Sequence, residues 1–377
     1  MKIVVAPDSF KGSLSAIEVA KTVEKAIKKV TPTAQVIMKP MADGGEGTLD
    51  CLLHTTNSRK VYVECKGPLG NNISSYYGIT SEKLAIIEIA NIAGLMQVPR
   101  NKRNPIRTTT YGLGEVIKDA LNRGCRSFTI GLGGSATNDG GLGMLIALGM
   151  KAYDKHGNEL KGFGKDLLQL ARVDVSTLDE RLKDANIQVA SDVDNPLCGK
   201  RGATATYGPQ KGLRRTEIET FDIAMEKYSS LIESALQKEY RHIPGSGAAG
   251  GLGFALLCLN ANIISGAKLV STMIELEKEI AHAQLVITGE GQSDEQTLFG
   301  KAPSYVAKLA NKHGVPAVLL SAAIKGDRDK LLQLFSGCFS ITNKPMTIQE
   351  SIGNVKTLLF EQTKNIMTLI KTIRKGV

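Results

Sequence analysis

The 377-residue chain contains no tryptophan, and aromatic residues make up only 5% of it. Proteins that bind single-stranded nucleic acid stack its bases on aromatic side chains, so this composition argues against that class of partner. The net charge of +10 has no dedicated basic tail apart from a short C-terminal end. Modest basic clusters, which include Lys211 and Arg214, are most simply solvated surface. The alternative is a mild positive field that attracts small anionic substrates.

Disulfide and metal-binding patterns are also missing. The six cysteines form no CxxC pair, and the five histidines form no HxH or HxxxH pair. Neither a disulfide framework nor a structural zinc site is supported, and the pattern fits a reducing cytoplasm. The N-terminus has no signal-peptide stretch. Residues 244–267 carry no charge, but glycines and two asparagines interrupt them, so we expect a Gly-rich loop leading into a buried helix and no membrane partner.

Three common catalytic signatures are absent: a GxxxxGK(S/T) phosphate loop, the protein-kinase HRD and DFG motifs, and a GxSxG elbow. Residues 131–136 and 245–250 match the dinucleotide fingerprint GxGxx(G/A). In the first match Gly140 and Gly141 interrupt the helix that should begin at once, and the second match follows no strand. An NAD(P)-dependent oxidoreductase acting on a small hydroxy acid stays as the alternative class. A non-catalytic anion or nucleic-acid binder, which only the net charge supports, is a third.

Strands and helices alternate at both ends of the chain. A strand over residues 2–6 leads to a helix whose start is marked by a capping box of Ser15 and Glu18. This alternation predicts a parallel sheet covered on both faces, whereas three strand-like runs between residues 59 and 89 predict an antiparallel meander. We therefore expect a discontinuous Rossmann- or flavodoxin-like α/β domain over residues 1–60 and 285–377. An inserted mixed α/β domain would cover residues 61–284.

Residues 131–141, with the sequence GLGGSATNDGG, are the most informative segment. They follow a strand-like run and precede a helix-like run. Such a junction offers free backbone N–H groups and the positive end of the helix dipole to a phosphate, and glycine lets backbone approach a ligand closely. The loop therefore predicts a phosphate site. Whether Asp139 contacts a metal ion, a ligand or only its own backbone stays open.

Carboxylates recur where predicted strands end, at Asp8, Asp43, Asp192 and Glu290. In open α/β sheets ligands bind outside the carboxyl ends of strands, so several acids there suggest a shared cleft with a divalent cation. In the segment SDVDNP, an extended backbone would place Asp192 and Asp194 on one side, roughly 7 Å apart. One could hold Mg²⁺ while the other accepts a proton from an attacking hydroxyl; an Asx-turn in a surface loop is the equal alternative. These residues indicate a Mg²⁺-dependent phosphoryl-transfer enzyme.

Eight segments resemble, in order, the bacterial glycerate kinases of the first type. They run from residue 6 to residue 303 and read APDSFKGSLSA, PMADGGEGT, RNPIRTTTYGLGE, GLGGSATNDGGLGML, SDVDNPLCG, YGPQKG, PGSGAAGGLG and VITGEGQSDEQTLFGKAP. The resemblance implies ATP-dependent phosphorylation of D-glycerate. It also implies two α/β domains, one flavodoxin- or Rossmann-like and the other inserted, with the active site in the cleft between them. Members commonly phosphorylate the 2-hydroxyl, although others are described as 3-kinases, so 2-phosphoglycerate is the favoured product.

The expected site follows from this resemblance and from the residue chemistry. Asp192 is the candidate general base, Lys11 would neutralise charge on the transferred phosphoryl group, and Asp8 completes the catalytic set. Asp194 and Asp43 are expected near Mg²⁺. The expected nucleotide-phosphate residues are Gly133, Gly134, Ser135, Thr137, Asn138, Gly247, Gly250 and Gly251. The expected substrate-binding residues are Arg107, Asp43, Gly44, Gly45, Glu46, Glu290, Ser293 and Asp294. ATP, Mg²⁺ and D-glycerate are the expected ligands, without nucleic acid; a homodimer stays open.

Overall fold

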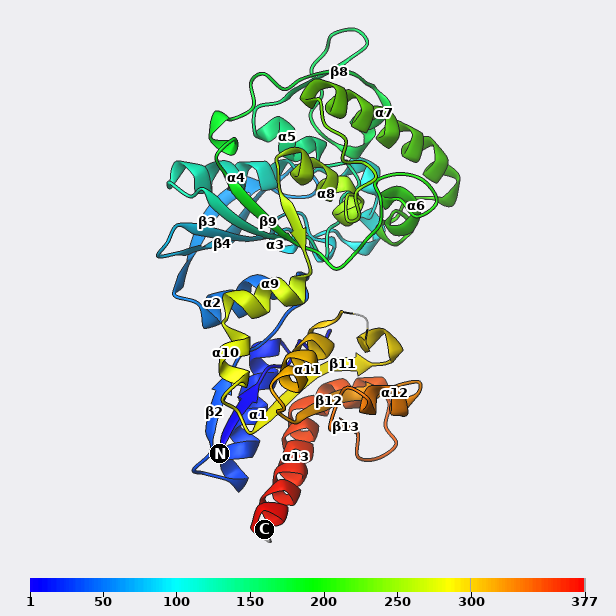
Figure 1. The fold of residues 1–377 in the computed structure, drawn as a ribbon. Helices are drawn as coiled ribbons and strands as arrows, with labels where there is room; N and C mark the ends of the chain where they lie inside the picture. The colour runs from blue at the N-terminus through cyan, green and yellow to red at the C-terminus, as the bar shows by residue number, and fades with distance from the viewer. Residues whose placement is uncertain (299, 376–377) are drawn as a thin grey trace. The chain divides into compact units, whose positions relative to one another are not determined.

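A computed structural model describes residues 1–298 and 300–375 and divides the chain into two compact units (Figure 1). The first unit comprises Met1–Asp43, Asp50–Thr56 and Ser265–Val377, and the second comprises Gly44–Leu49 and Asn57–Ile264. The first unit therefore contains both the N-terminal segment, blue in Figure 1, and the C-terminal segment, orange to red. The domain boundaries expected near residues 60 and 285 stay a prediction.

The first unit is built on a five-stranded sheet in the order β2-β1-β11-β12-β13, in which every neighbouring pair is parallel. Counted along the chain within this unit, the order is 2-1-3-4-5, which is the flavodoxin-like doubly wound order. The strands are β1 (Lys2–Val5), β2 (Gln35–Met38), β11 (Leu285–Ser293), β12 (Ala317–Ile324) and β13 (Gly337–Ser340). The predicted α/β class with a parallel sheet is confirmed.

The helices of this unit are α1 (Ala16–Val30), α9 (Gly266–Met273), α10 (Leu276–Ile280), α11 (Ala302–Lys312), α12 (Arg328–Leu332) and α13 (Ile348–Lys375), and α2 (Thr48–Thr55) begins in the second unit. Helix α1 begins at the predicted capping box of Ser15 and Glu18. Ile3 and Val5 share one core with residues of α1 and α13, because alternate strand residues point to the same face. Helix α11 packs against β11 and β12.

The second unit contains a six-stranded mixed sheet in the order β10-β9-β6-β5-β4-β3. The predicted meander is present, since β3 pairs antiparallel with β4 and β4 with β5, while the remaining pairs are parallel. The strands are β3 (Ser58–Lys66), β4 (Asn72–Thr80), β5 (Leu84–Glu88), β6 (Ser127–Gly131), β9 (Asn186–Ala190) and β10 (Asn262–Ile264). A hairpin of β7 (Lys151–Asp154) and β8 (Leu170–Asp174) completes the strands of this unit.

The helices of the second unit are α3 (Ala90–Ala93), α4 (Tyr111–Asn122), α5 (Leu142–Ala147), α6 (Ala203–Tyr207), α7 (Ile218–Leu236) and α8 (Ala248–Cys258). Helix α8 is the expected buried helix of the uncharged stretch. It is kinked at its start, where Ala249, Gly250 and Gly251 all have positive φ. Across residues 1–298 and 300–375, no helix has both the length and the apolar character needed to cross a membrane.

Candidate functional site

Polar side chains of the first unit gather where the strand order of its sheet changes direction. β1 has β2 on one side and β11 on the other, and in doubly wound sheets ligands bind at such a switch point. Asp8 follows β1, and its backbone N–H donates to the carbonyl of Gly289 in β11 at 2.8 Å. Glu290 is the next residue of β11 and is buried. The fold therefore places both carboxylates at the switch point.

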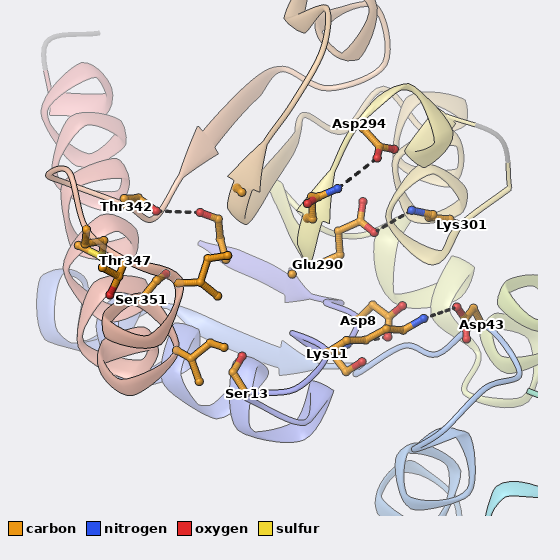
Figure 2. Close-up of a pocket in the computed structure, with 18 residues that line it drawn as sticks. Asp8, Lys11, Ser13, Asp43, Glu290, Asp294, Lys301, Thr342, Thr347 and Ser351 are labelled. Atoms are coloured by element: carbon orange, nitrogen blue, oxygen red, sulfur yellow. Dashed lines mark hydrogen bonds and ion pairs between the residues drawn. The ribbon is translucent and has the colours of Figure 1, made fainter. Parts of the chain in front are cut away.

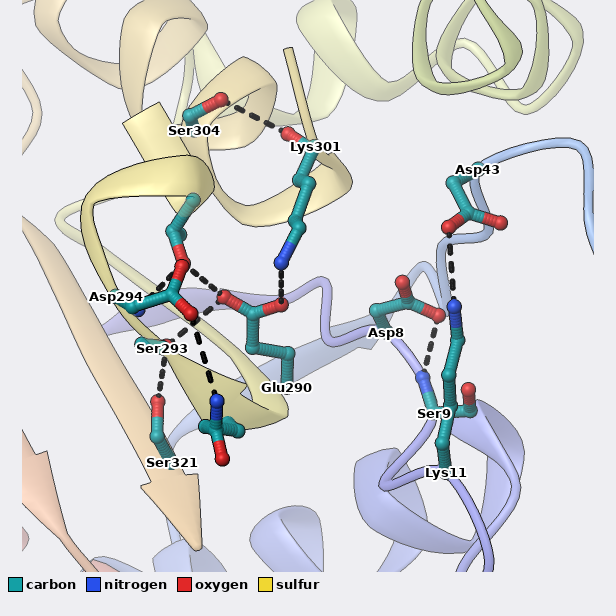
Figure 3. Close-up of polar contacts among 12 residues, drawn as sticks. Asp8, Ser9, Lys11, Asp43, Glu290, Ser293, Asp294, Lys301, Ser304 and Ser321 are labelled. Atoms are coloured by element: carbon teal, nitrogen blue, oxygen red, sulfur yellow. Dashed lines mark hydrogen bonds and ion pairs between the residues drawn. The ribbon is translucent and has the colours of Figure 1, made fainter. Parts of the chain in front are cut away.

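Each carboxylate in this group has defined partners (Figure 3). Lys11 Nζ lies 3.4 Å from Asp43 Oδ2, and Lys301 Nζ lies 3.7 Å from Glu290 Oε2. The other oxygen of Glu290 accepts hydrogen bonds from Ser293 Oγ at 2.9 Å and from Thr297 Oγ1 at 2.6 Å. Glu290 is thus held as a fixed acceptor, whereas the side chain of Lys11 is exposed and able to reach a ligand.

The electrostatics of this group centre on Asp8. Burial, followed by the nearby carboxylate of Asp43, raises the pKa of Asp8 to about 7. The same Asp43 carboxylate raises the pKa of Lys11, which therefore stays charged. The carboxylates repel one another, so bound positive charge would stabilise the group.

These carboxylates offer the oxygen ligands that Mg²⁺ prefers. Mg²⁺ keeps several waters and is commonly bound through one or two carboxylates plus substrate phosphates. Within residues 1–298 and 300–375, no three or more His, Cys, Asp or Glu side chains are arranged to hold a metal ion. Asp8 and Asp43 therefore fit a cation that arrives with phosphate oxygens better than a cation held by the protein alone.

The group lines one end of a pocket with a volume of about 600 Å³, which we call the carboxyl-edge pocket (Figure 2). Its walls come from the segments that follow β1, β2 and β13, from the end of β11 and the segment after it, from the last residues of β12, and from the start of α13. Five of the predicted site residues line it, namely Asp8, Lys11, Asp43, Glu290 and Asp294. Ser293, another predicted site residue, does not line the pocket. It is buried, and its hydroxyl donates a hydrogen bond to Glu290.

In the second unit, residues 131–141 join β6 to α5, as the sequence predicts. Their glycines, however, lie against other backbone segments. A Cβ added at Gly133 would lie 2.3 Å from Gly45 Cα, and one added at Gly250 would lie 2.0 Å from the carbonyl oxygen of Thr137. The structure therefore brings the predicted segments 44–45, 131–141 and 245–251 together. Close packing explains these glycines, and phosphate binding by them stays a prediction.

Most of the 131–141 loop is enclosed. Gly134 is exposed and Gly133 half-buried, but Ser135, Thr137 and Asn138 are buried. The side-chain oxygens Thr137 Oγ1 and Asn138 Oδ1 have no hydrogen-bond partner among the described residues. A phosphate approaching the loop would meet the backbone around Gly133 and Gly134 first.

Lys211 is buried, although its sequence context predicts a solvated position. Only 4% of it is exposed, and its Nζ donates to Ser135 Oγ at 2.9 Å and to the carbonyl of Thr137 at 2.7 Å. Burial lowers its pKa to about 7. The expectation of a solvated surface lysine is therefore wrong, because Lys211 supports the 131–141 loop from inside. Its place within the segment YGPQKG was the available signal.

Asp139 is fully buried, and both of its carboxylate oxygens accept hydrogen bonds from neighbouring residues. One of its oxygens accepts from the backbone N–H and the hydroxyl of Thr110, at 2.7 and 2.8 Å, and from Gly143 N at 3.3 Å. The other accepts from Gly141 N at 3.2 Å. Asp139 thereby joins the starts of α4 and α5. Glu88 is a buried carboxylate that the sequence did not single out. It accepts hydrogen bonds from the backbone N–H groups of Gly47 and Leu49 and so fixes the segment after Gly44 and Gly45.

The remaining predicted residues of the second unit lie on its surface. Asp192, Arg107 and Glu46 are exposed. Asp194 is exposed and paired with Arg201, whose Nη2 lies 3.1 Å from both carboxylate oxygens. The segment that carries Asp192 is tied to the 245–251 loop, because Gly247 N donates to the carbonyl of Asn195 at 2.9 Å. The roles of these residues stay predictions.

Comparison with known proteins decides the family. The model of the glycerate kinase family matches residues 3–371. This chain belongs to the glycerate kinase family. It is 42% identical to a glycerate kinase of Bacillus subtilis over 98% of both chains, and 42% identical to a glycerate 2-kinase of Escherichia coli over 97% of both.

A solved structure gives the same result. A crystal structure titled "putative glycerate kinase 2" from Salmonella typhimurium LT2 superposes with a TM-score of 0.89 at 40% identity, covering 100% of this chain and 99% of that one. The resemblance drawn from the eight segments is confirmed, as is the prediction of a kinase. The oxidoreductase alternative finds no support in these matches.

Proposed function

We propose that this glycerate kinase family member transfers the γ-phosphoryl group of ATP to D-glycerate in a Mg²⁺-dependent reaction. The observation that carries the proposal is the carboxylate and lysine group at the switch point, in a chain that matches the family over residues 3–371. The group has the positive and negative side chains that phosphoryl transfer needs, since catalysis there depends on positioning and on neutralising charge. D-Glycerate and a nucleotide are the proposed partners.

Asp8, Asp43 and Lys11 have the proposed roles closest to the transferred group. Asp8 and Asp43 would hold Mg²⁺, which when bound neutralises phosphate oxygens as charge develops on them. Lys11 would place its exposed ammonium group against an oxygen of the same phosphoryl group. Asp194, paired with Arg201, stays a further proposed metal ligand.

Asp192 is the proposed general base. Its exposed carboxylate would accept the proton of the glycerate hydroxyl as that oxygen attacks the phosphorus. Arg107, exposed at the end of a short 3₁₀ helix over Pro105–Arg107, is the proposed partner of the glycerate carboxylate. The other proposed substrate residues are Gly44, Gly45, Glu46, Glu290, Ser293 and Asp294, and the proposed phosphate residues are Gly133, Gly134, Ser135, Thr137, Asn138, Gly247, Gly250 and Gly251.

Phosphorylation of the 2-hydroxyl is the proposed regiochemistry. The name glycerate 2-kinase, given to the Escherichia coli relative, supports it. A cytoplasmic location and a homodimer remain predictions.

Phosphorus NMR of the product formed from D-glycerate, ATP and Mg²⁺ tests both the activity and the position. The proposal expects a new resonance of 2-phosphoglycerate together with ADP, and loss of both when Mg²⁺ is chelated. A 3-phosphoglycerate resonance would contradict the proposed position alone. Unchanged ATP and D-glycerate, with a protein shown to be folded by circular dichroism, would contradict the proposed activity.

A further inference from the structure

The carboxyl-edge pocket is divided into two chemically different ends (Figure 2). Its charged lining residues are Asp8, Lys11, Asp43, Glu290, Asp294 and Lys301. They lie together at one side of the view, whereas Thr342, Thr347 and Ser351 lie at the other. No formally charged side chain lines this second end within the part of the chain that the structure describes.

The uncharged end is built from the last residues of β12, the segment after β13 and the first turn of α13. Among its lining residues are Ala322, Thr342, Met346, Ile348, Ser351 and Ile352. The hydroxyl of Thr342 donates to the carbonyl of Ala322 at 2.9 Å, which fixes the segment after β13 against β12. The start of α13 is fixed in turn, since Thr347 and Glu350 exchange hydrogen bonds across its first turn.

Two isoleucines at this end are unusually open to water. Ile348 is 79% exposed and Ile352 is 45% exposed. Covering such side chains with an apolar ligand surface is favourable. The neighbouring wall is made of small residues, Ala322 and Ala323, beside hydroxyl groups. A flat apolar ring carrying a hydroxylated group therefore matches this end of the pocket better than a small charged molecule does.

We infer that the uncharged end of the carboxyl-edge pocket binds the base and ribose of the nucleoside triphosphate, with its phosphates directed toward Lys11 and the carboxylates at the charged end. A nucleoside triphosphate is apolar at one end and highly charged at the other, as the pocket is. The volume of about 600 Å³ also suits a ligand of that size rather than a three-carbon acid alone. This inference rests on the proposed function for the identity of the donor.

Variants of the exposed isoleucines test the assignment. A carboxylate introduced by Ile352→Asp or Ile348→Asp would lie against the base. We expect each variant to raise the KM for ATP and the Kd for ADP by at least ~10-fold, the scale of losing one buried aliphatic contact. The KM for D-glycerate and the Kd for Mg²⁺-tripolyphosphate, which has no nucleoside, should stay within about twofold. Calorimetry gives the two Kd values.

Ile373→Asp is the matched control, because Ile373 lies on the same helix and is 58% exposed but does not line the pocket. If Ile348→Asp and Ile352→Asp have the same Kd for ADP as Ile373→Asp, the inference is wrong. If they raise the KM for D-glycerate instead, that end holds the acceptor and the inference is also wrong. A wild-type protein that binds ADP but does not phosphorylate D-glycerate would contradict the proposed function and leave the nucleoside assignment supported.

A fluorescence measurement gives an independent readout, since the chain has no tryptophan of its own. In Ile352→Trp, ADP should change the intensity or wavelength of the indole emission, whereas tripolyphosphate and D-glycerate should not. Ile373→Trp should respond to none of them. An Ile352→Trp emission that ADP leaves unchanged at saturating concentration contradicts the assignment.

Discussion

Lys211 shows how a single buried residue couples the site region to pH. Its ammonium group is enclosed and donates to the Ser135 hydroxyl and the Thr137 carbonyl, while Asp139 supplies the nearby negative charge. Burial disfavours the charged form, which lowers the pKa from 10.5 to about 7. Between these two values the unfolded chain binds a proton that the folded chain does not. Stability should therefore rise with pH across that window.

We predict that Lys211→Met removes this part of the pH dependence. The free energy of unfolding of the wild type, measured in urea at several values between pH 7 and 10, should rise more steeply than that of the variant. Lys200→Met, at an exposed position of the same unit, should follow the wild type. Parallel profiles for the wild type and Lys211→Met would show that Lys211 does not carry the shifted proton.

The buried hydrogen bonds of Asp139 predict that its substitution lowers the stability of the fold. Its carboxylate accepts hydrogen bonds from Thr110, Gly141 and Gly143 in a buried setting. In Asp139→Asn the amide NH₂ group would face donors, so the free energy of unfolding should fall by ~2–4 kcal/mol. Urea unfolding measures it, and Asp184→Asn at an exposed position is the control. A loss as small as that of the control would contradict the bridging role.

Asp192 carries the prediction for the chemical step. If it is the general base, Asp192→Asn should lower kcat by at least ~10²-fold, while the KM for ATP and the circular dichroism spectrum stay close to those of the wild type. Asp192 is exposed, so folding should not depend on it. Turnover near the wild-type rate would remove Asp192 from the catalytic set.

At the scale of loops and helices, two glycines allow the cost of close packing to be measured apart from the cost of an unusual backbone conformation. Gly250 has φ +73°, and a Cβ there would lie 2.0 Å from the carbonyl oxygen of Thr137. Gly157, in the β7–β8 hairpin, has a similar φ of +84° but nothing within 4 Å of its added Cβ. Substitution by alanine at both positions therefore imposes the same backbone cost and differs only in packing.

We predict that Gly157→Ala destabilises the protein by about 1 kcal/mol, the cost of the left-handed conformation. Gly250→Ala should destabilise it by at least ~2 kcal/mol more, because the 245–251 loop must move away from the 131–141 loop. Thermal and urea unfolding of the two variants measure the difference. If both variants lose the same free energy of unfolding, the 131–141 and 245–251 loops are free to move apart.

The loops also show what sequence reasoning can reach. The position of residues 131–141 between a strand and a helix was predictable, because hydrophobic runs and glycines are local signals, and so was the Ser15 capping box. The reason for the glycines was not, since Gly45 lies far from Gly133 in sequence yet packs against it. The burial of Lys211 depends on the same non-local contacts, which composition and spacing do not reveal.

At the scale of the whole molecule, alternation of strands and helices predicts the fold class but not the strand order. Ile3 pairs with Leu285, which lies far from it along the chain. That pairing creates the switch point where Asp8 and Glu290 meet. The sequence predicts each of these acids at a strand end, and only the sheet shows that the two strands are neighbours. The uncharged end of the pocket had no sequence signal, because alanines, threonines and isoleucines are common everywhere.

We propose that the switch-point group of the first unit carries phosphoryl transfer to glycerate. The turnover number of Lys11→Met with ATP, Mg²⁺ and D-glycerate is the decisive measurement. Lys11 is exposed and its ion pair with Asp43 is long at 3.4 Å, so the variant should fold normally. We predict that kcat falls by at least ~10²-fold, while Lys308→Met, at an exposed position of α11, keeps wild-type turnover. Equal turnover of Lys11→Met and the wild type would show that this group does not carry the transfer.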